Sequence, residues 1–367
     1  MNRILIIDTS YPINSRNQRI LDSLILKYGI GNVRFVAWNR DNREVLKMHS
    51  DMYIQNQVSP YGNRLRKVLS LLNFYKYIKA SVDDFQPEIL IASHWDSLFL
   101  VQFLKTKYRK IVYENLDLPT SSNKFILFCL QKLEAYSLRK VNLISFASRF
   151  YPPLYSSYKI KKIVLENKVA SSVPFLKTIK RDRKCFLLTF IGNIRYSDIL
   201  ENVINVVKDN SKIQFVLHGE GPDYKYLKMK YADIKNVIFT GKYRYEDVAS
   251  LFQSSDVVWA AYPSKDHNVK YAISNKYHES IYYGVPCIYA VDTLLGNYVK
   301  QKKLGYVVDP YNLADIKQLL YDILNGNETC LIKENLLKEK IDDKNWEEEI
   351  KPFISEIEQL FDTNDGE

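Results

Sequence analysis

Short apolar runs alternate with stretches of helical periodicity along the first half of this 367-residue chain. Apolar runs bounded by turn residues predict strands, and apolar residues spaced three and four apart predict amphipathic helices. The predicted strands are 3–8, 33–38, 89–92, 110–114 and 143–147. The predicted helices are 18–28, 64–82, 97–106 and 124–139. Such alternation is typical of a parallel sheet with helices on both faces, so we expect residues 1–165 to form one Rossmann-like domain.

The same alternation restarts after a polar stretch at 165–184, which we interpret as a linker. The predicted strands of this second block are 186–191, 213–219, 237–240, 256–260, 286–290 and 306–308. Its predicted helices are 199–208, 224–231, 245–253, 275–283 and 314–324. We therefore expect a second Rossmann-like domain at 166–345, followed by an amphipathic helix within 346–367. The expected fold class is α/β with two doubly wound domains, which bind ligands at the carboxyl ends of their strands.

Charge is divided unevenly between the two halves. Residues 1–165 contain 25 Lys and Arg against 12 Asp and Glu, whereas the remainder contains 27 against 30. A basic first half favours an anionic partner, such as nucleic acid, a phospholipid surface or a pyrophosphate-linked substrate; general solubility is the alternative explanation. The basic residues are dispersed and match no nucleic-acid-binding module, so we expect no nucleic-acid partner.

Membrane contact is expected to be peripheral. The apolar runs fall short of the ~20 residues that a membrane-spanning helix needs, and the first residues lack the apolar region of a secretory signal. We therefore expect a cytoplasmic protein. The segment 63–79 is predicted to lie on an anionic membrane surface at the inner face of the plasma membrane. The alternative is that it only packs into its own domain, and the two can also occur together. Its basic residues are Arg64, Arg66, Lys67, Lys76 and Lys79, and its apolar face is Leu65, Leu69, Leu72 and Tyr75.

One predicted helix start carries the residues that a nucleotide diphosphate needs. Ser274 or Asn275 can cap the helix, whose first turns then present Lys276 and Glu279. Backbone N–H groups at a helix N-terminus attract phosphate oxygens, Lys276 adds a full positive charge, and Glu279 can accept both hydroxyls of a ribose. The alternative is an exposed ion pair on an ordinary surface helix.

This segment resembles the donor motif of a known enzyme family. The matching residues are Asn275-Lys276-x-x-Glu279 followed by Gly284-x-Pro286. They resemble the retaining GT-B glycosyltransferases of family 4, the group 1 glycosyltransferases of bacterial surface polysaccharide synthesis. The resemblance implies a GT-B fold, with two Rossmann-like domains facing across a cleft and a C-terminal helix crossing back to the first domain. It also implies that Glu279 holds the donor ribose and that the residues before it, Ser274 included, meet the pyrophosphate.

Two further segments resemble the donor-binding loops of the same family. Gly192, Asn193 and Arg195 follow the first strand of the second block, where the family brings backbone and a basic residue to the phosphate. Gly219 and Gly221 follow the next strand, where two glycines suit a tight turn beside the nucleotide base. For Arg195, a surface arginine with no ligand is the alternative.

The first half carries residues that the resemblance assigns to the sugar and acceptor side. His94 follows a predicted strand and corresponds to a histidine that faces the transferred sugar in the family; a packed histidine is the alternative. Glu114 and Asp117 follow the next strand and are suited to orienting acceptor hydroxyls or accepting a proton. Arg16 and Arg19 stand where many relatives have a glycine-rich loop, so we expect them to contact a phosphate of the donor or the acceptor.

The reaction implied by the resemblance is transfer of a hexosyl-type sugar from a nucleotide-diphosphate sugar to a glycan, with retention of configuration. The expected donor is a UDP-sugar first and a GDP-sugar second. The expected acceptor is a lipid-linked glycan in the synthesis of capsule, exopolysaccharide or another surface glycan. No Asp-x-Asp motif follows a predicted strand, so we expect no metal site and no cofactor beyond the donor.

Two alternatives stay open. Sugar-nucleotide epimerases share the two-domain architecture but act on the donor without an acceptor. A non-catalytic protein of GT-B type is the other, because Tyr271 stands where the family commonly has a second glutamate and the loop at 11–19 lacks glycines.

Overall fold

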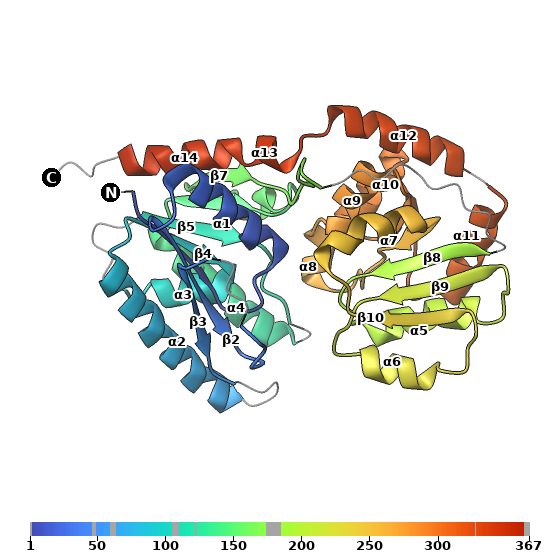
Figure 1. Cartoon of the computed structure of the whole chain (residues 1–367), viewed down its shortest axis with the longest axis horizontal. Helices are drawn as coiled ribbons and strands as arrows, with labels where there is room; N and C mark the ends of the chain where they lie inside the picture. The colour runs from blue at the N-terminus through green and yellow to red at the C-terminus, as the bar shows by residue number, and fades with distance from the viewer. Residues whose placement is uncertain are drawn as a thin grey trace. The chain divides into compact units, whose positions relative to one another are not determined.

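The computed structural model contains two compact units (Figure 1). Unit 1 is Met1–Glu166 together with Glu348–Glu367, and unit 2 is Asn167–Glu347. The residues described are 2–45, 49–58, 64–104, 110–121, 123–173, 185–326 and 328–362, with only the backbone of 64–69 and 245. Much of the predicted linker, 174–184, therefore lies outside the described residues. Within the described parts of the chain, no helix is both long and apolar enough to cross a membrane.

Unit 1 is built on a parallel sheet, sheet A, in the strand order β3-β2-β1-β4-β5-β6-β7. Its strands are β1 Ile4–Asp8, β2 Val33–Asn39, β3 Met52–Asn56, β4 Ile89–Ser93, β5 Lys110–Asn115, β6 Leu143–Phe146 and β7 Lys161–Val164. Its helices before the linker are α1 Ser15–Tyr28, α2 Arg64–Phe85, α3 His94–Val101 and α4 Lys124–Ser137, with short 3-10 turns at Leu138–Lys140 and Pro152–Tyr155. Figure 1 shows α1 on one face of sheet A and α2, α3 and α4 on the other.

The central strands of sheet A match the predicted ones because most of their residues are apolar. All residues of β1, β2 and β4 are buried, as expected for strands covered on both faces. The edge strands β3 and β7 were not predicted. Both are largely half-exposed and mix polar with apolar residues, so no apolar run marks them.

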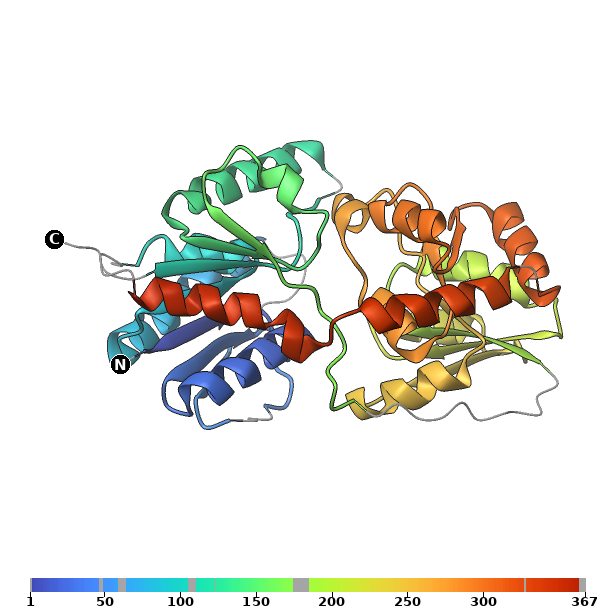
Figure 2. The same ribbon diagram turned by 90° about the horizontal axis from the view of Figure 1, so that it is seen from above.

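The end of the chain packs on unit 1 as α14, Lys351–Asp362, which Figure 2 shows in red. Phe353 and Ile357 are fully buried there, and Glu358 forms an ion pair with Lys27 of α1. The sequence predicted one helix over 346–361, but α13, Trp346–Glu349, ends before α14 begins. Pro352 explains the break, because it has no N–H to donate to the preceding turn.

Unit 2 repeats this architecture on sheet B, in the order β10-β9-β8-β11-β12-β13. Its strands are β8 Phe186–Ile191, β9 Ile213–His218, β10 Val237–Gly241, β11 Val257–Trp259, β12 Cys287–Ala290 and β13 Tyr306–Val308. Its helices are α5 Ser197–Val207, α6 Tyr224–Lys230, α7 Val248–Ser254, α8 His267–Tyr271, α9 Asn275–Tyr283, α10 Leu294–Lys302, α11 Leu313–Leu324 and α12 Thr329–Asp342. Figure 1 shows α5 and α6 on one side of sheet B, and α7, α9 and α10 on the other.

The predicted fold class is confirmed, since each unit contains a parallel, doubly wound, Rossmann-like sheet. In both sheets the strand order reverses beside the first strand of the unit, β1 or β8. Ligands of such sheets bind outside the carboxyl ends of the strands at this reversal. The carboxyl edge of each sheet is therefore where a functional site is expected.

Candidate functional site

Two glycine-containing loops meet at the carboxyl edge of sheet B. Gly192 follows β8 with φ 155° and Gly219 follows β9 with φ 129°. A Cβ atom on Gly219 would lie 1.8 Å from the Gly192 carbonyl oxygen, and one on Gly221 would lie 2.1 Å from the Asn193 side-chain oxygen. The loops are joined by backbone bonds, including Gly192 N to His218 O at 3.0 Å. Only glycine allows the two loops to pack this closely.

A chain of aromatic contacts connects the first loop to α9. Arg195 is exposed, and its guanidinium lies 4.7 Å from the centre of the Tyr196 ring. Tyr196 has φ 66° and makes an edge contact with Tyr262, which follows β11, at 6.4 Å between ring centroids. Tyr262 in turn interacts electrostatically with Lys276 of α9. Residues predicted from separate motifs therefore lie along one edge of unit 2.

Helix α9 carries a buried ion pair. Lys276 and Glu279 lie one turn apart, and the Lys276 Nζ donates to Glu279 Oε2 at 2.5 Å. Both side chains are about nine-tenths buried, and the ammonium also lies 5.4 Å from the centre of the Phe252 ring. The pair is therefore not the exposed surface pair that the sequence left open as the alternative.

Electrostatics keep Lys276 charged. Burial alone would lower its pKa, but the Glu279 carboxylate, together with the phenol groups of Tyr262 and Tyr243, raises the pKa of Lys276 above its usual value. An ammonium group has three N–H donors, and one of them is used by Glu279. The other two donors can bind oxygens of a phosphate while the ion pair stays formed.

The N-terminus of α9 is capped by its own residues. Ser274 accepts a hydrogen bond from the Lys276 N–H at 3.2 Å, and the Tyr277 N–H donates to the Ser274 carbonyl at 2.9 Å. Asn275 is exposed, and its side-chain oxygen accepts from Asn167 at 3.0 Å. Because two amides of the first turn have internal partners, the positive charge at this end comes mainly from Lys276.

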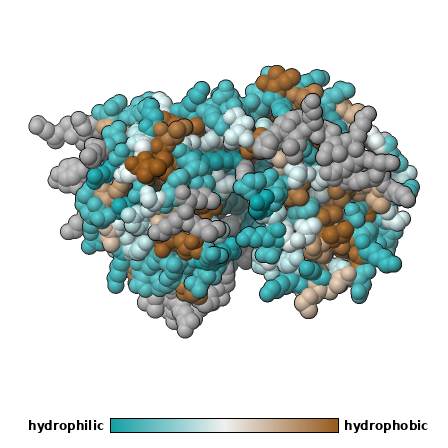
Figure 3. Space-filling model, in the orientation of Figure 1, coloured by the Kyte–Doolittle hydropathy of each residue, from teal (hydrophilic) through white to brown (hydrophobic). Residues whose placement is uncertain are grey.

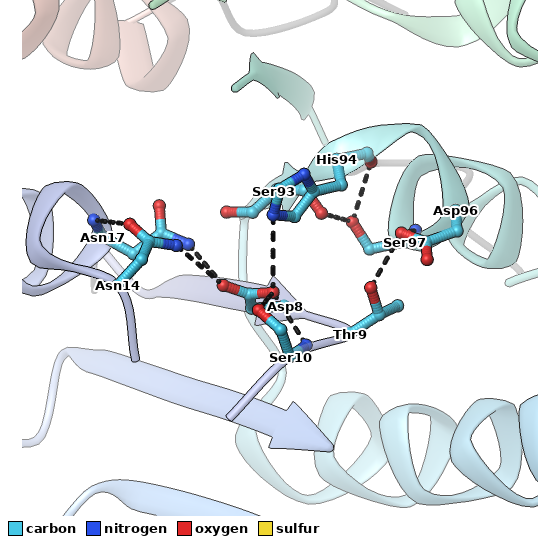
Figure 4. Close-up of polar contacts among 9 residues, drawn as sticks. All are labelled: Asp8, Thr9, Ser10, Asn14, Asn17, Ser93, His94, Asp96 and Ser97. Atoms are coloured by element: carbon cyan, nitrogen blue, oxygen red, sulfur yellow. Dashed lines mark hydrogen bonds and ion pairs between the residues drawn. The ribbon is translucent and has the colours of Figure 1, made fainter. Parts of the chain in front are cut away.

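A second polar cluster lies at the carboxyl edge of sheet A, around Asp8 at the end of β1 (Figure 4). The fully buried Asp8 carboxylate accepts from Ser10, through both its N–H at 2.9 Å and its hydroxyl at 2.7 Å. It also accepts from the side-chain amides of Asn17 at 2.6 Å and Asn14 at 3.3 Å. His94 faces the same carboxylate, with 3.9 Å between His94 Nε2 and Asp8 Oδ1.

The backbone and the surrounding charges both constrain His94. It has φ 68°, an unusual conformation for a residue with a side chain, and its carbonyl accepts from Ser97 Oγ at 3.0 Å. Burial opposes protonation, but the carboxylates of Asp8, Asp117 and Asp96 raise the pKa of His94 above its usual value. The imidazole is therefore suited to donating hydrogen bonds to an anion or a sugar hydroxyl.

Arg16 and Glu114 form an internal ion pair. Arg16 Nε donates to Glu114 Oε1 at 2.5 Å, and other guanidinium nitrogens donate to the Leu165 carbonyl and to Ser145 Oγ. Both side chains are almost completely buried, so Glu114 faces inward from the end of β5. Of the other predicted residues on this side, Asp117 is exposed and Arg19 is half-buried. Direct contacts of these residues with substrate stay predictions.

The carboxyl edge of sheet A also contains buried polar atoms that accept no hydrogen bond from any described residue. They are Asn17 Oδ1, Ser93 Oγ, Glu114 Oε2 and Asn115 Oδ1. Buried polar atoms almost always bind a partner, which is either protein, ordered water or a ligand. This edge is consequently suited to a molecule rich in hydroxyl groups. Among the described residues, no group of His, Cys, Asp and Glu has the arrangement of a metal site.

Sequence reasoning missed Asp8 and Tyr262. Asp8 ends an apolar strand, and Asn14 and Asn17 lie three residues apart at the start of α1. This spacing could have predicted that both asparagine side chains bind one group, which is the Asp8 carboxylate. Tyr262 follows a strand end in the same way. Neither residue lies in a segment that resembles a motif of the glycosyltransferase family.

The fold of the chain is similar to that of several solved structures. Sucrose-phosphate synthase from Thermosynechococcus elongatus superposes with a TM-score of 0.77 at 12% identity, over 99% of this chain and 100% of that one. The Anabaena protein HepE in complex with UDP gives 0.71 at 13% identity, over 97% and 100%. The UDP-forming α,α-trehalose-phosphate synthase from Burkholderia xenovorans, in complex with glucose-6-phosphate, gives 0.68 at 10% identity, over 97% and 100%. No curated protein sequence matches the chain.

One sequence comparison bears directly on the edge of sheet B. Residues 175–339 match the family model of the glycosyl transferases, group 1. The group 1 glycosyl transferase match lies wholly within unit 2 and includes Gly192, Arg195, Gly219, Lys276 and Glu279. At this low identity the structural neighbours show the fold, whereas the family match identifies unit 2 as similar to the group 1 glycosyl transferases.

Proposed function

We propose that the chain is a glycosyltransferase that moves a hexosyl-type sugar from a UDP-sugar to a glycan acceptor, with retention of configuration. The observation that carries the proposal is the buried Lys276–Glu279 pair of α9, which Tyr262 and Tyr196 link to the loop after β8, within the region that matches the group 1 glycosyl transferases. UDP is preferred as the nucleotide because one of the structural neighbours was solved with UDP; a GDP-sugar is the second choice.

In this proposal unit 2 binds the donor. The two remaining N–H donors of Lys276, with Arg195, bind the diphosphate, and Glu279 accepts from the ribose hydroxyls. In the transfer step the bond between the sugar C1 and the β-phosphate oxygen breaks. The acceptor hydroxyl oxygen bonds to C1 on the same face, and its proton passes to the departing phosphate. Cations held near that phosphate stabilise the developing charge and lower the barrier.

Unit 1 binds the sugar and the acceptor in the same proposal. His94, oriented by Asp8, donates a hydrogen bond to the transferred sugar, and Asp117 accepts from an acceptor hydroxyl. Arg16 and Glu114 keep the start of α1 fixed to the end of β5. We further propose that the acceptor is a lipid-linked glycan of a capsule, exopolysaccharide or other surface polysaccharide, which fits the basic charge of residues 1–165.

The proposal is tested by calorimetry with UDP and GDP, followed by assays of nucleotide release from UDP-sugars with and without lipid-linked glycans. We expect UDP to bind and UDP release to depend on the acceptor. Conversion of the donor without any acceptor would instead identify an epimerase. Failure to bind any nucleotide would favour a non-catalytic protein of the same fold.

A further inference from the structure

Helix α4 exposes a continuous stripe of aromatic and basic side chains. Its members, spaced three or four residues apart, are Phe125, Phe128, Lys132, Tyr136 and, just after the helix, Arg139. This spacing places them on one side of the helix. Phe125 is 74% exposed, Phe128 54% and Tyr136 49%. Large exposed aromatic groups in such a row are unusual on a surface that contacts only water.

The stripe does not contribute to the core of unit 1. Helix α4 is held by its opposite side, where Glu134 and Ser137 are buried. The Glu134 carboxylate accepts from the hydroxyls of Tyr113 at 2.7 Å and Tyr155 at 2.8 Å. The fold therefore does not need the exposed phenylalanines, and their exposure has another explanation.

The exposed charges of α4 and the residues that flank it have one sign. Residues 123–140 contain four basic side chains, Lys124, Lys132, Arg139 and Lys140, and all four are exposed. The one acidic residue of this stretch, Glu134, faces inward, and burial raises the pKa of its carboxyl group. Two of the cations lie against the aromatic rings: Lys132 Nζ is 5.3 Å from the Phe128 centroid, and the Arg139 guanidinium is 5.0 Å from that of Tyr136.

Two other exposed apolar patches lack this match. Figure 3 shows apolar surface over α1 and α12. Leu26 of α1 is next to Lys27, which pairs with Glu358. Leu337 and Ile341 of α12 lie among lysines and glutamates of the same helix. These patches carry charges of both signs, so they are not complementary to an anionic surface.

Helix α2 contains the segment for which the sequence predicted membrane contact, but its large apolar side chains do not form an exposed stripe like that of α4. Phe74 and Ile78 of α2 are fully buried, and Phe74 stacks on Trp38 at 5.8 Å. Leu72 is 53% exposed and Tyr75 is half-buried. The side chains of Arg64, Leu65, Arg66, Lys67 and Leu69 lie outside the described residues. The described part of α2 thus buries one face in the core of unit 1, while its exposed face carries Lys76 and Lys79 together with Asp83 and Asp84, charges of both signs.

We propose that the α4 stripe is a docking surface for an anionic lipid bilayer. Phe125 and Phe128 enter the interface between headgroups and acyl chains, while the four basic side chains contact anionic headgroups. Phenylalanine is among the apolar side chains that interfacial helices bury at this boundary, and Tyr136 adds a ring with a polar hydroxyl group. The inference deepens the proposed function by naming the surface that meets a lipid-linked acceptor. It can fail separately, since vesicle binding is measured without a sugar donor.

The test is flotation of the full chain with vesicles of phosphatidylcholine, with or without phosphatidylglycerol. We expect binding only to the anionic vesicles. In Phe125→Ser/Phe128→Ser and in Lys124→Gln/Lys132→Gln, binding is expected to fall by roughly tenfold or more, since each basic residue near an anionic surface contributes about fivefold. The matched controls on α12, Leu337→Ser/Ile341→Ser and Lys333→Gln/Lys338→Gln, are expected to bind like the original chain.

Labelling supplies an independent readout. Cys129 lies on α4 next to Phe128, and Cys330 lies on α12; both are free and exposed. In single-cysteine variants, an environment-sensitive fluorophore on Cys129 is expected to shift to the blue with anionic vesicles, whereas one on Cys330 is not. Equal flotation of the α4 variants and the original chain would overturn the proposal. So would self-association that requires Phe125 and Phe128 without any vesicle binding.

The two proposals are separated by measuring UDP affinity in the same variants. UDP binding without vesicle binding overturns the docking surface and leaves the glycosyltransferase proposal standing. Vesicle binding without binding of any nucleotide overturns the glycosyltransferase proposal and leaves the docking surface standing.

Discussion

At the residue scale, the Lys276–Glu279 pair is the feature that most constrains the chemistry of unit 2. A buried ion pair contributes little net stability, because desolvation of both groups offsets their attraction. Removing one partner alone leaves an uncompensated buried charge, which costs about 3–5 kcal/mol. The pair is therefore easier to explain as a preformed binding group than as a source of stability.

If the pair binds the donor, substitutions of Lys276 and Glu279 should affect UDP affinity and thermal stability differently. Lys276→Gln and Glu279→Gln are each expected to weaken UDP binding by about 1–3 kcal/mol, the range for a lost hydrogen bond to a charged group. The double variant is expected to recover thermal stability but not affinity. Calorimetry and thermal unfolding measure the two effects.

The matched control for this prediction is Lys230→Gln. Lys230 of α6 also forms an ion pair, with Glu201 at 2.7 Å, but on the opposite side of sheet B and with more exposure. UDP affinity is expected to stay unchanged in this variant. Unchanged affinity in all of the Lys276 and Glu279 variants would remove these residues from the donor site.

His94 provides a second prediction at this scale. Because carboxylates raise its pKa in the folded chain, protonated His94 stabilises the fold at pH values below its unfolded pKa. This contribution is lost as pH rises through the folded pKa. In Asp8→Asn the strongest raising charge is gone, so NMR titration is expected to find a lower pKa for His94. A pKa that does not move would show that Asp8 does not control the imidazole.

At the scale of elements, the loops after β8 and β9 are packed tightly against each other. Backbone bonds connect Gly192, Ile194 and Gly219 to the neighbouring loops, and close approach leaves no room for side chains. Short loops fixed in this way allow the backbone to approach a ligand closely without an ordering cost on binding.

The packing of these loops predicts a large effect of one methyl group. Gly219→Ala combines positive-φ strain of about 1–2 kcal/mol with overpacking against Gly192, which costs about 1–3 kcal/mol more. Both stability and UDP affinity are expected to fall. Gly326→Ala is the control, because Gly326 also has positive φ, 77°, but nothing lies within 4 Å of its Cβ position.

The two glycine variants are compared by chemical denaturation and calorimetry. Gly326→Ala is expected to lose only the strain energy and to keep its UDP affinity. If Gly219→Ala behaves in the same way, the loops tolerate more movement than their contacts indicate.

At the scale of the whole molecule, unit 1 is completed by a segment that follows unit 2 in the chain. Phe353 and Ile357 of α14 are fully buried in unit 1, and Lys161–Glu356 adds an ion pair beside β7. Unit 1 is thus not a continuous stretch of sequence, and its stability depends on the C-terminal end of the chain.

This arrangement predicts that damage to α14 affects unit 1. Ile357→Ala is expected to cost about 2–5 kcal/mol of unfolding free energy, as for other buried aliphatic side chains. UDP affinity, which the proposal assigns to unit 2, is expected to stay unchanged below the unfolding transition. Glu358→Ala, which removes an exposed ion pair, is expected to cost less than about 1 kcal/mol. A loss of UDP affinity in folded Ile357→Ala would show that UDP binding depends on the packing of α14 on unit 1.

Much of the fold was predictable because its signals are local. The central strands are continuous apolar runs, and the helices between them follow helical periodicity, so the two Rossmann-like units follow from patterns of a few residues. The edge strands β3 and β7 were missed because half-exposed strands lack such runs. The resemblance to a donor motif is also local, since it rests on the short stretch from Asn275 to Pro286.

The sequence by itself determined the two parallel sheets, the strand ends that carry polar residues, and the similarity of Lys276 and Glu279 to a donor motif. Only the tertiary structure decided the partners of these polar residues. Arg16 pairs with Glu114, 98 residues away, and Asp8 faces His94, because β1, β4 and β5 are neighbours in sheet A. Periodicity reports which face of an element is buried, whereas the order of strands decides which side chains share that interior, and this order is not encoded in any short stretch of the chain.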